Sequence, residues 1–93
     1  MPEVLATFHQ PVLGSNSLSY SAQACGGDMG NGMWEGWIEF MPVEGGPPIR
    51  SQRETTQPNR ADAIYWAGGL GATYLEGALE RALHPLEIGR AHV

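Results

Sequence analysis

The stretch from Ile49 to Leu83, IRSQRETTQPNRADAIYWAGGLGATYLEGALERAL, decides the fold. Residues 49–56 read as a strand that is polar on both faces, whereas residues 59–84 carry helix signals and an apolar stripe. Strands of small domains normally give apolar side chains to the core from at least one face. A segment that breaks this pattern is where function often lies.

The second half of the stretch predicts helix. Asn59 is a favourable N-cap, and Asp62 three residues later resembles a capping box. Pro85 requires the helix to stop before it. The i, i+3, i+4, i+7, i+8 spacing of a single helix face is matched by Leu75, Ala78, Leu79, Ala82 and Leu83.

Three glycines interrupt the helical region: Gly68, Gly69 and Gly71. Together they would cost a helix interior about 3 kcal/mol relative to alanine. We therefore predict a break, with a short helix near 59–67 and a longer one near 72–84. The alternative is one continuous helix whose glycines allow a close approach to the sheet.

Three further strands are predicted upstream, over residues 4–12, 18–25 and 33–41. Glycine-rich segments at 26–32 and 42–48 indicate hairpin turns between them. With residues 49–56 as the fourth strand, the expected fold class is α+β. It consists of a four-stranded antiparallel β-meander followed by a C-terminal helical region, one kinked or two short helices, packed on one face.

Length and composition narrow the class of protein. The 93 residues predict a single domain over 1–85 and a flexible tail over 86–93. A net charge of −5 opposes phosphate backbones, so we expect no nucleic-acid partner. The absence of lysine excludes Schiff-base chemistry and a P-loop. With one cysteine, no readable signal peptide and no apolar run of about 18 residues, we expect a cytoplasmic protein without a membrane partner.

The polar strand is expected to pair with residues 33–41 across a turn centred on Gly45. Residues whose numbers sum to about 90 then face each other, which places Trp37 opposite Arg53, Glu39 opposite Ser51 and Glu35 opposite Thr55. An arginine over an indole ring, flanked by two carboxylates, is a favourable cross-strand arrangement. The aromatic ring of Trp37 is a candidate contact for another chain if that face of the sheet is open.

Two interpretations of residues 49–56 remain open. The first is an edge strand, because edges are often polar and charged to discourage aggregation. The second is a polar pocket or docking seam between the sheet and the helices, with Trp66 or Tyr65 as a wall. Its polar groups would come from Arg50, Arg53, Glu54, Thr56 and Gln57.

Other chemistry has weaker support in the sequence. The loop GGDMGNG at 26–32 does not match a phosphate-binding glycine pattern. The histidines and Cys25 lack the spacing of a metal site, so we predict no metal and no cofactor. Cys25 is expected to be a buried small residue, and a Glu35–Glu39 acid–base pair is conceivable on one strand face.

The segment ALERAL at 78–83 resembles the alanine-rich helix of HicB-type antitoxin domains. In that group a three-stranded antiparallel sheet is followed by a helix. The resemblance covers a minor part of the chain and implies no functional residue.

The sequence therefore favours a small acidic protein-interaction module that is non-catalytic and self-associating, binding itself or another protein. An enzyme is not excluded. The alternative is a small-ligand-binding protein or weak enzyme, with a polar pocket between residues 49–56 and the helices that grips a small anionic compound. The candidate binding residues are Trp37, Arg50, Arg53, Glu54, Thr56 and Trp66. No catalytic residue is predicted.

Overall fold

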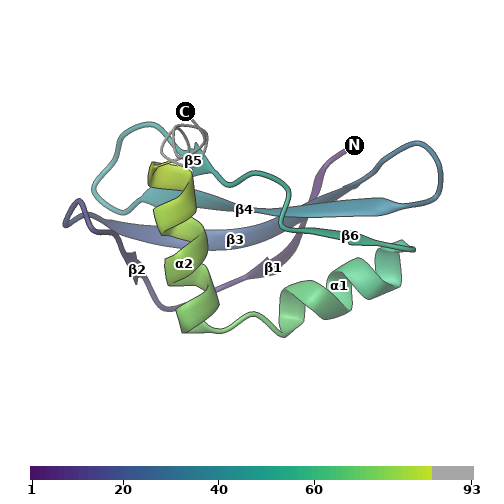
Figure 1. Ribbon diagram of the computed structural model, residues 1–93. Coiled ribbons are helices and arrows are strands. Elements are labelled where there is room, and N and C mark those ends of the chain that lie inside the picture. Colours follow the sequence, from purple (N-terminus) through teal and green to yellow (C-terminus); the bar gives the residue numbers. More distant parts are fainter. Residues whose placement is uncertain (85–93) are drawn as a thin grey trace, which may run out of the picture.

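The computed structural model describes residues 1–84, which form an open antiparallel sheet of six strands and two helices (Figure 1). The α+β class predicted from the sequence is confirmed. The predicted tail over 86–93 lies outside the described residues. In chain order the elements are β1 (Glu3–Thr7), β2 (Val12–Leu13), β3 (Ser19–Asp28), β4 (Trp34–Pro42), β5 (Ile49–Arg50), β6 (Thr55–Gln57), α1 (Arg60–Gly68) and α2 (Ala72–Leu83).

The two long strands β3 and β4 form the centre of the sheet. They pair without interruption from Tyr20 opposite Pro42 to Asp28 opposite Trp34. Both β1 and β2 pair with β3, and both β5 and β6 pair with β4. The predicted strand over 4–12 is thus divided into two. The Phe8 N–H still donates to the Ala22 carbonyl (3.2 Å), but residues 8–11 belong to neither strand, and Pro11 has no N–H to donate.

The predicted fourth strand over 49–56 is also divided, and its predicted register is wrong. Ser51 explains the interruption: its N–H donates to the Ile38 carbonyl (2.8 Å), and its Oγ accepts from the Ile38 N–H (2.9 Å). The hydroxyl takes the place of a ladder carbonyl, so the chain leaves regular pairing. Pairing resumes where the Glu54 N–H donates to the Gly36 carbonyl (2.7 Å).

The interruption adds two residues to the outer chain. Glu39 lies opposite Arg50 on one side of it, and Glu35 lies opposite Thr56 on the other. The predicted pairs of Arg53 with Trp37, Ser51 with Glu39 and Thr55 with Glu35 are therefore not formed. The predicted turn itself is confirmed, with Gly45 and Gly46 at φ angles of 98° and 122°. Glycine adopts such positive φ angles without a steric penalty.

The glycine-rich segment breaks the helical region into two helices, as predicted. Asn59 caps α1, because its side-chain oxygen accepts from the Asp62 N–H at 2.8 Å. Gly69 and Gly71 lie outside both helices, where they avoid the cost that glycine carries in a helix interior. The predicted apolar face of α2 is confirmed by the burial of Leu75, Ala78 and Leu79.

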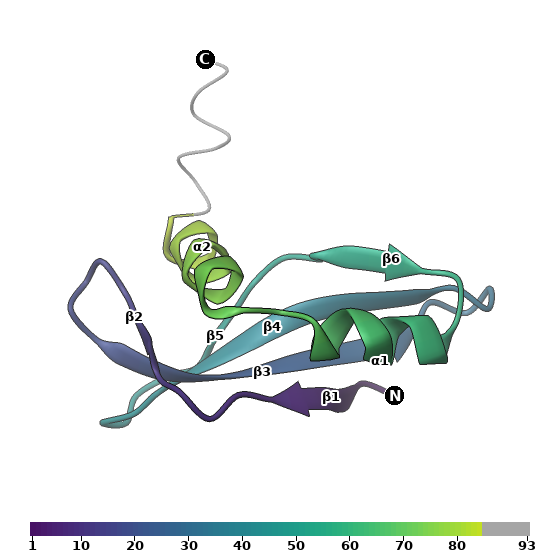
Figure 2. The ribbon, with the colours of Figure 1, turned by 90° about the horizontal axis from the view of Figure 1, so that it is seen from below.

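Both helices pack on the same face of the sheet, with α1 between β1 and β6 and α2 near β2 and β5 (Figure 2). The core lies between them and the sheet. From the strands it receives Tyr20, Ala22, Ala24, Ile38 and Phe40, and from the helices Ala67, Leu75, Ala78 and Leu79. The rings of Tyr20 and Phe40 meet edge to face with centroids 6.4 Å apart. Burial of this apolar surface is the main stabilising contribution.

The opposite face of the sheet, here called the helix-free face, carries the odd-numbered residues of β3 and β4. Because side chains alternate along a strand, residues that pair across the ladder share a face. One row across this face consists of Val4, Cys25 and Trp37. Thr56 lies on the same face, opposite Glu35. Its residues are the starting point for the functional site.

Candidate functional site

Trp37 lies on the helix-free face, but its ring is covered. The guanidinium carbon of Arg50 lies 4.0 Å from the ring centroid, and the indole N–H donates to Glu39 Oε2 at 3.1 Å. The residue is only 2% exposed. The arginine that stacks on the indole is therefore Arg50 and not Arg53. The ring of Trp37 lies beneath the Arg50 side chain and is not part of the exposed surface of this face.

Arg53 forms a second charged contact on the helix-free face. Its Nε lies 3.7 Å from Glu35 Oε1, and its Nη1 donates to Thr56 Oγ1 at 3.2 Å. Both side chains are partly exposed. The face thus holds two acids and two arginines close to the sheet, Glu35 with Arg53 and Glu39 beside Arg50.

Glu54 is directed to the helix side of the sheet, away from the two arginines. Its Oε1 accepts from the Tyr74 hydroxyl and from Arg81 Nη2, each at 2.5 Å. Its side chain is 8% exposed, whereas that of Arg81 is about half exposed. Burial, with the hydrogen bond to Glu54, raises the pKa of Tyr74 to about 12. Glu54 therefore connects the interrupted strand to α2.

Trp66 also lies on the helix side, where its ring packs against the backbone of Gly36. The six predicted binding residues are thus divided between the two faces of the sheet. Trp37, Arg50, Arg53 and Thr56 belong to the helix-free face, and Glu54 and Trp66 to the helix side. They do not line one common pocket among residues 1–84.

The helix-free face has an apolar end that the sequence analysis did not single out. Leu13 and Val43 flank Ser19, since Leu13 pairs with it and the Val43 N–H donates to its carbonyl at 2.9 Å. Met41 lies opposite Ser21 on the same face. These three side chains, here called the apolar end, are 63%, 58% and 49% exposed for Leu13, Val43 and Met41.

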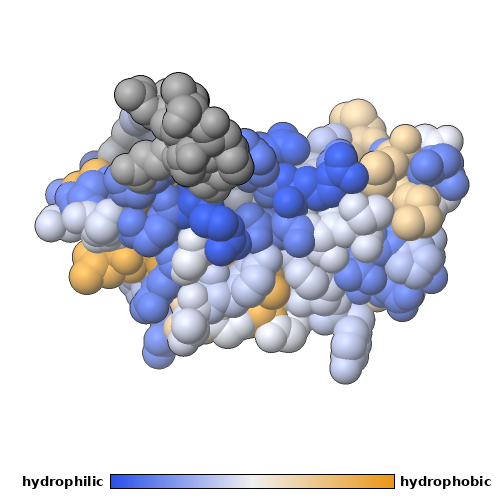
Figure 3. All heavy atoms as spheres, viewed as in Figure 1, coloured by the Kyte–Doolittle hydropathy of each residue, from blue (hydrophilic) through white to orange (hydrophobic). Residues whose placement is uncertain are grey.

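Two of the three residues of the apolar end could have been predicted from the sequence. Met41 continues the alternation of Glu35, Trp37 and Glu39, and Leu13 follows the buried Val12. Hydrophobic surface also shows at the end of the sheet where β2 lies (Figure 3). Val43 was less visible, because Pro42 and the following glycines place it in a turn segment.

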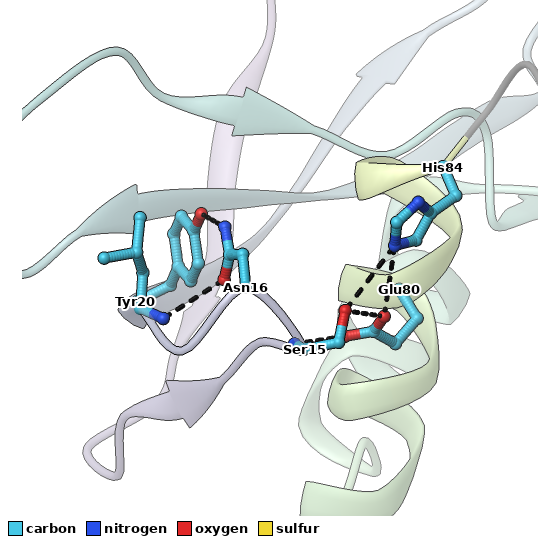
Figure 4. A network of polar contacts seen from close by, with 6 residues as sticks. Ser15, Asn16, Tyr20, Glu80 and His84 are labelled. Carbon is cyan, nitrogen blue, oxygen red and sulfur yellow. Dashed lines mark hydrogen bonds and ion pairs between the residues drawn. The ribbon is translucent and has the colours of Figure 1, made fainter.

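A polar cluster joins the turn before β3 to α2 (Figure 4). Glu80 accepts from both the N–H (2.8 Å) and the hydroxyl (2.7 Å) of Ser15, and His84 Nε2 lies 3.5 Å from the same hydroxyl. These hydrogen bonds from Ser15 lower the pKa of Glu80. In a catalytic triad the carboxylate would contact the other ring nitrogen of the histidine. Here it binds the serine directly, so the cluster holds the turn in place.

Other chemical groups are in inert settings. Cys25 is buried, and burial raises the pKa of its thiol to about 11, which makes it a weak nucleophile. Among residues 1–84, no three His, Cys, Asp or Glu side chains gather as a metal site would require. None of the helices in this part of the chain is long and apolar enough to cross a membrane.

Comparison of the chain with protein-family models, with curated proteins and with solved structures finds no match. The resemblance of residues 78–83 to HicB-type antitoxin helices receives no support there.

Proposed function

We propose that this protein is a non-catalytic interaction module that self-associates through the helix-free face of its sheet. The observation that carries the proposal is the apolar end, Leu13, Met41 and Val43, which is about half exposed on a face that neither helix covers. Contiguous exposed apolar side chains rimmed by polar ones are typical of protein–protein contacts.

Charge supports a second copy of the chain as the partner. The charged residues of this face are two acids, Glu35 and Glu39, and two arginines, Arg50 and Arg53. The charges of these four residues sum to zero, whereas the rest of the chain has eight acids and three arginines. Two copies can therefore meet on the helix-free face without the repulsion that other faces would bring.

In this proposal the parts of the helix-free face have different roles. The apolar end supplies side chains that a partner can bury. Glu35 and Arg53 are partly exposed, so in a two-fold contact each can meet its opposite on the other copy. Trp37 acts indirectly, because the guanidinium group of Arg50 lies over its ring.

A ligand pocket between residues 49–56 and the helices receives less support. Such a pocket needs polar groups that are free to contact a ligand. Glu54 is instead engaged by Tyr74 and Arg81, and Arg53 by Glu35 and Thr56.

The test is the mass of the protein in solution, measured by sedimentation equilibrium. The wild-type chain is expected at twice its 10.0 kDa monomer mass. Val43→Asp places a charge in the apolar end and should weaken dimerisation by tenfold or more, since a buried anchor typically contributes above 1 kcal/mol. Val43 is largely exposed, so the fold should persist.

The matched control is Tyr65→Asp, which adds the same charge on α1 at a residue that is 86% exposed. It should leave the mass of the dimer unchanged. A wild-type monomer at every concentration would contradict the proposal, and so would a dimer that tolerates Val43→Asp.

A further inference from the structure

A pocket of about 400 Å³ opens beside the start of α2. One wall is the chain from Thr7 to Val12, which connects β1 to β2, and the other is the chain from Leu70 to Glu76. The connection between β1 and β2 passes next to the end of α2 at which the helix begins (Figure 1). The volume lies within the range of small-molecule sites.

The floor of the pocket is apolar. Val12 and Leu75 are each 4% exposed and belong to the core, and Phe8 and Leu70 are partly buried against it. A ligand with an apolar group would therefore contact a fixed surface that is already packed. Such a preformed surface lowers the cost of binding.

The rim of the pocket is polar, and its polar side chains are not engaged by the protein. His9, Gln10 and Glu76 line it, and none of these three side chains bonds to another residue among 1–84. An apolar floor with a small number of polar groups around it is the usual form of a ligand site.

The mixture of groups defines the chemical class. Glu76 supplies a carboxylate that attracts a cation, whereas His9 and Gln10 supply N–H donors suited to a carboxylate oxygen. A simple anion would meet Glu76 unfavourably, and a simple amine would leave the donors without a partner. We propose that the pocket binds a small zwitterion with an apolar side group, of the class of free apolar α-amino acids.

In the bound state the ammonium group of the ligand donates to Glu76. Its carboxylate accepts from His9 and Gln10, and its apolar group lies against Phe8, Leu70 and Leu75. This site does not depend on self-association, because none of Leu13, Met41 and Val43 lines the pocket.

The test is a titration of the isotope-labelled full chain with L-leucine, followed by amide chemical shifts. Shifts confined to residues 7–12 and 70–76, with a Kd below about 1 mM, are expected. N-acetyl-L-leucine lacks the ammonium group and isoamylamine lacks the carboxylate, so each should bind at least tenfold more weakly.

Variants complete the test. Glu76→Gln should weaken leucine binding tenfold or more, and Glu44→Gln, which removes a charge outside the pocket, should not change it. Val43→Asp should bind leucine as the wild type does, so failure of one proposal is separable from failure of the other. Absence of shifts, shifts centred elsewhere, or equal binding of N-acetyl-L-leucine would overturn the site.

Discussion

Gly36 shows how one residue sets the approach of a helix to the sheet. It is the third residue of β4 and faces the ring of Trp66 on α1. A Cβ at this position would lie 2.5 Å from the Trp66 ring and 3.0 Å from Thr55 Cγ2. Both distances are shorter than normal van der Waals contact, so α1 can pack here only because residue 36 has no side chain.

Gly36→Ala is therefore expected to destabilise the domain by about 1–3 kcal/mol, because the methyl group forces Trp66 and α1 away from the sheet. Urea unfolding measures the change. The control is Gly68→Ala, where a Cβ meets no atom within 4 Å and stability should stay equal or rise by up to about 1 kcal/mol. Equal stability of Gly36→Ala and the wild type would show that Trp66 does not pack as described.

At the scale of elements, Tyr74 reports on the contact between α2 and the interrupted strand. Its pKa is raised from 10.0 to about 12, first by burial and then by the hydrogen bond to Glu54. A pKa that is higher in the folded state gives stability that is complete below pH 10 and is lost as the pH rises to about 12. As the pH rises through this range, the Tyr74 hydroxyl loses its proton in the unfolded chain before it does so in the folded one.

The wild type should therefore lose more stability than Tyr74→Phe when urea unfolding is compared across pH 10 to about 12. Phenylalanine keeps the ring of Tyr74 but has no proton to lose. Parallel loss of stability in both proteins would mean that the Tyr74 hydroxyl does not contact Glu54 in solution.

The turn before β3 and α2 are joined in a comparable way by Ser15 and Glu80. Ser15→Ala removes the hydroxyl donor and leaves the backbone N–H, so the pKa of Glu80 should rise partway to its ordinary value of 4.5. Because this pKa is lowered in the folded state, the contact stabilises the fold above pH 4.5 and is lost at lower pH. Carboxyl chemical shifts of Glu80 measure the change, and an unaltered titration would contradict the contact.

The elements show how far the sequence predicts this fold. Alternation placed β3 and β4, and the cap at Asn59 with the glycines at 68–71 placed both helices. The interruption at Ser51 was not predictable, because it depends on a side chain that replaces a backbone acceptor. Before the interruption, Arg50 lies opposite Glu39, one residue away from the predicted register, and this turns it to the face of Trp37. After the interruption, the two added residues place Arg53 beside Glu35 and Thr56.

The candidate site was predicted only in part for the same reason. The sequence placed charged groups around Trp37, and the structure has them there. It did not separate Glu54 and Trp66 from the others, because the direction of each side chain depends on the true register. The apolar end was missed because Leu13 and Val43 come together only through their shared neighbour Ser19.

The molecule as a whole has two unlike faces. On one, two short helices cover the core, and Glu54 of the interrupted strand binds Tyr74 and Arg81 of α2. On the other face, two acids and two arginines whose charges sum to zero lie beside the apolar end. No helix or strand among residues 1–84 covers them. A small domain that leaves apolar side chains on one open face gains stability when a second copy covers them.

The most direct test of this account mixes labelled and unlabelled protein and detects nuclear Overhauser contacts between copies only. The account predicts such contacts from the methyl groups of Leu13, Met41 and Val43, and none from Ile64 on α1. Contacts between copies that arise from the helices, or no contacts at concentrations well above the expected Kd, would contradict self-association through the helix-free face.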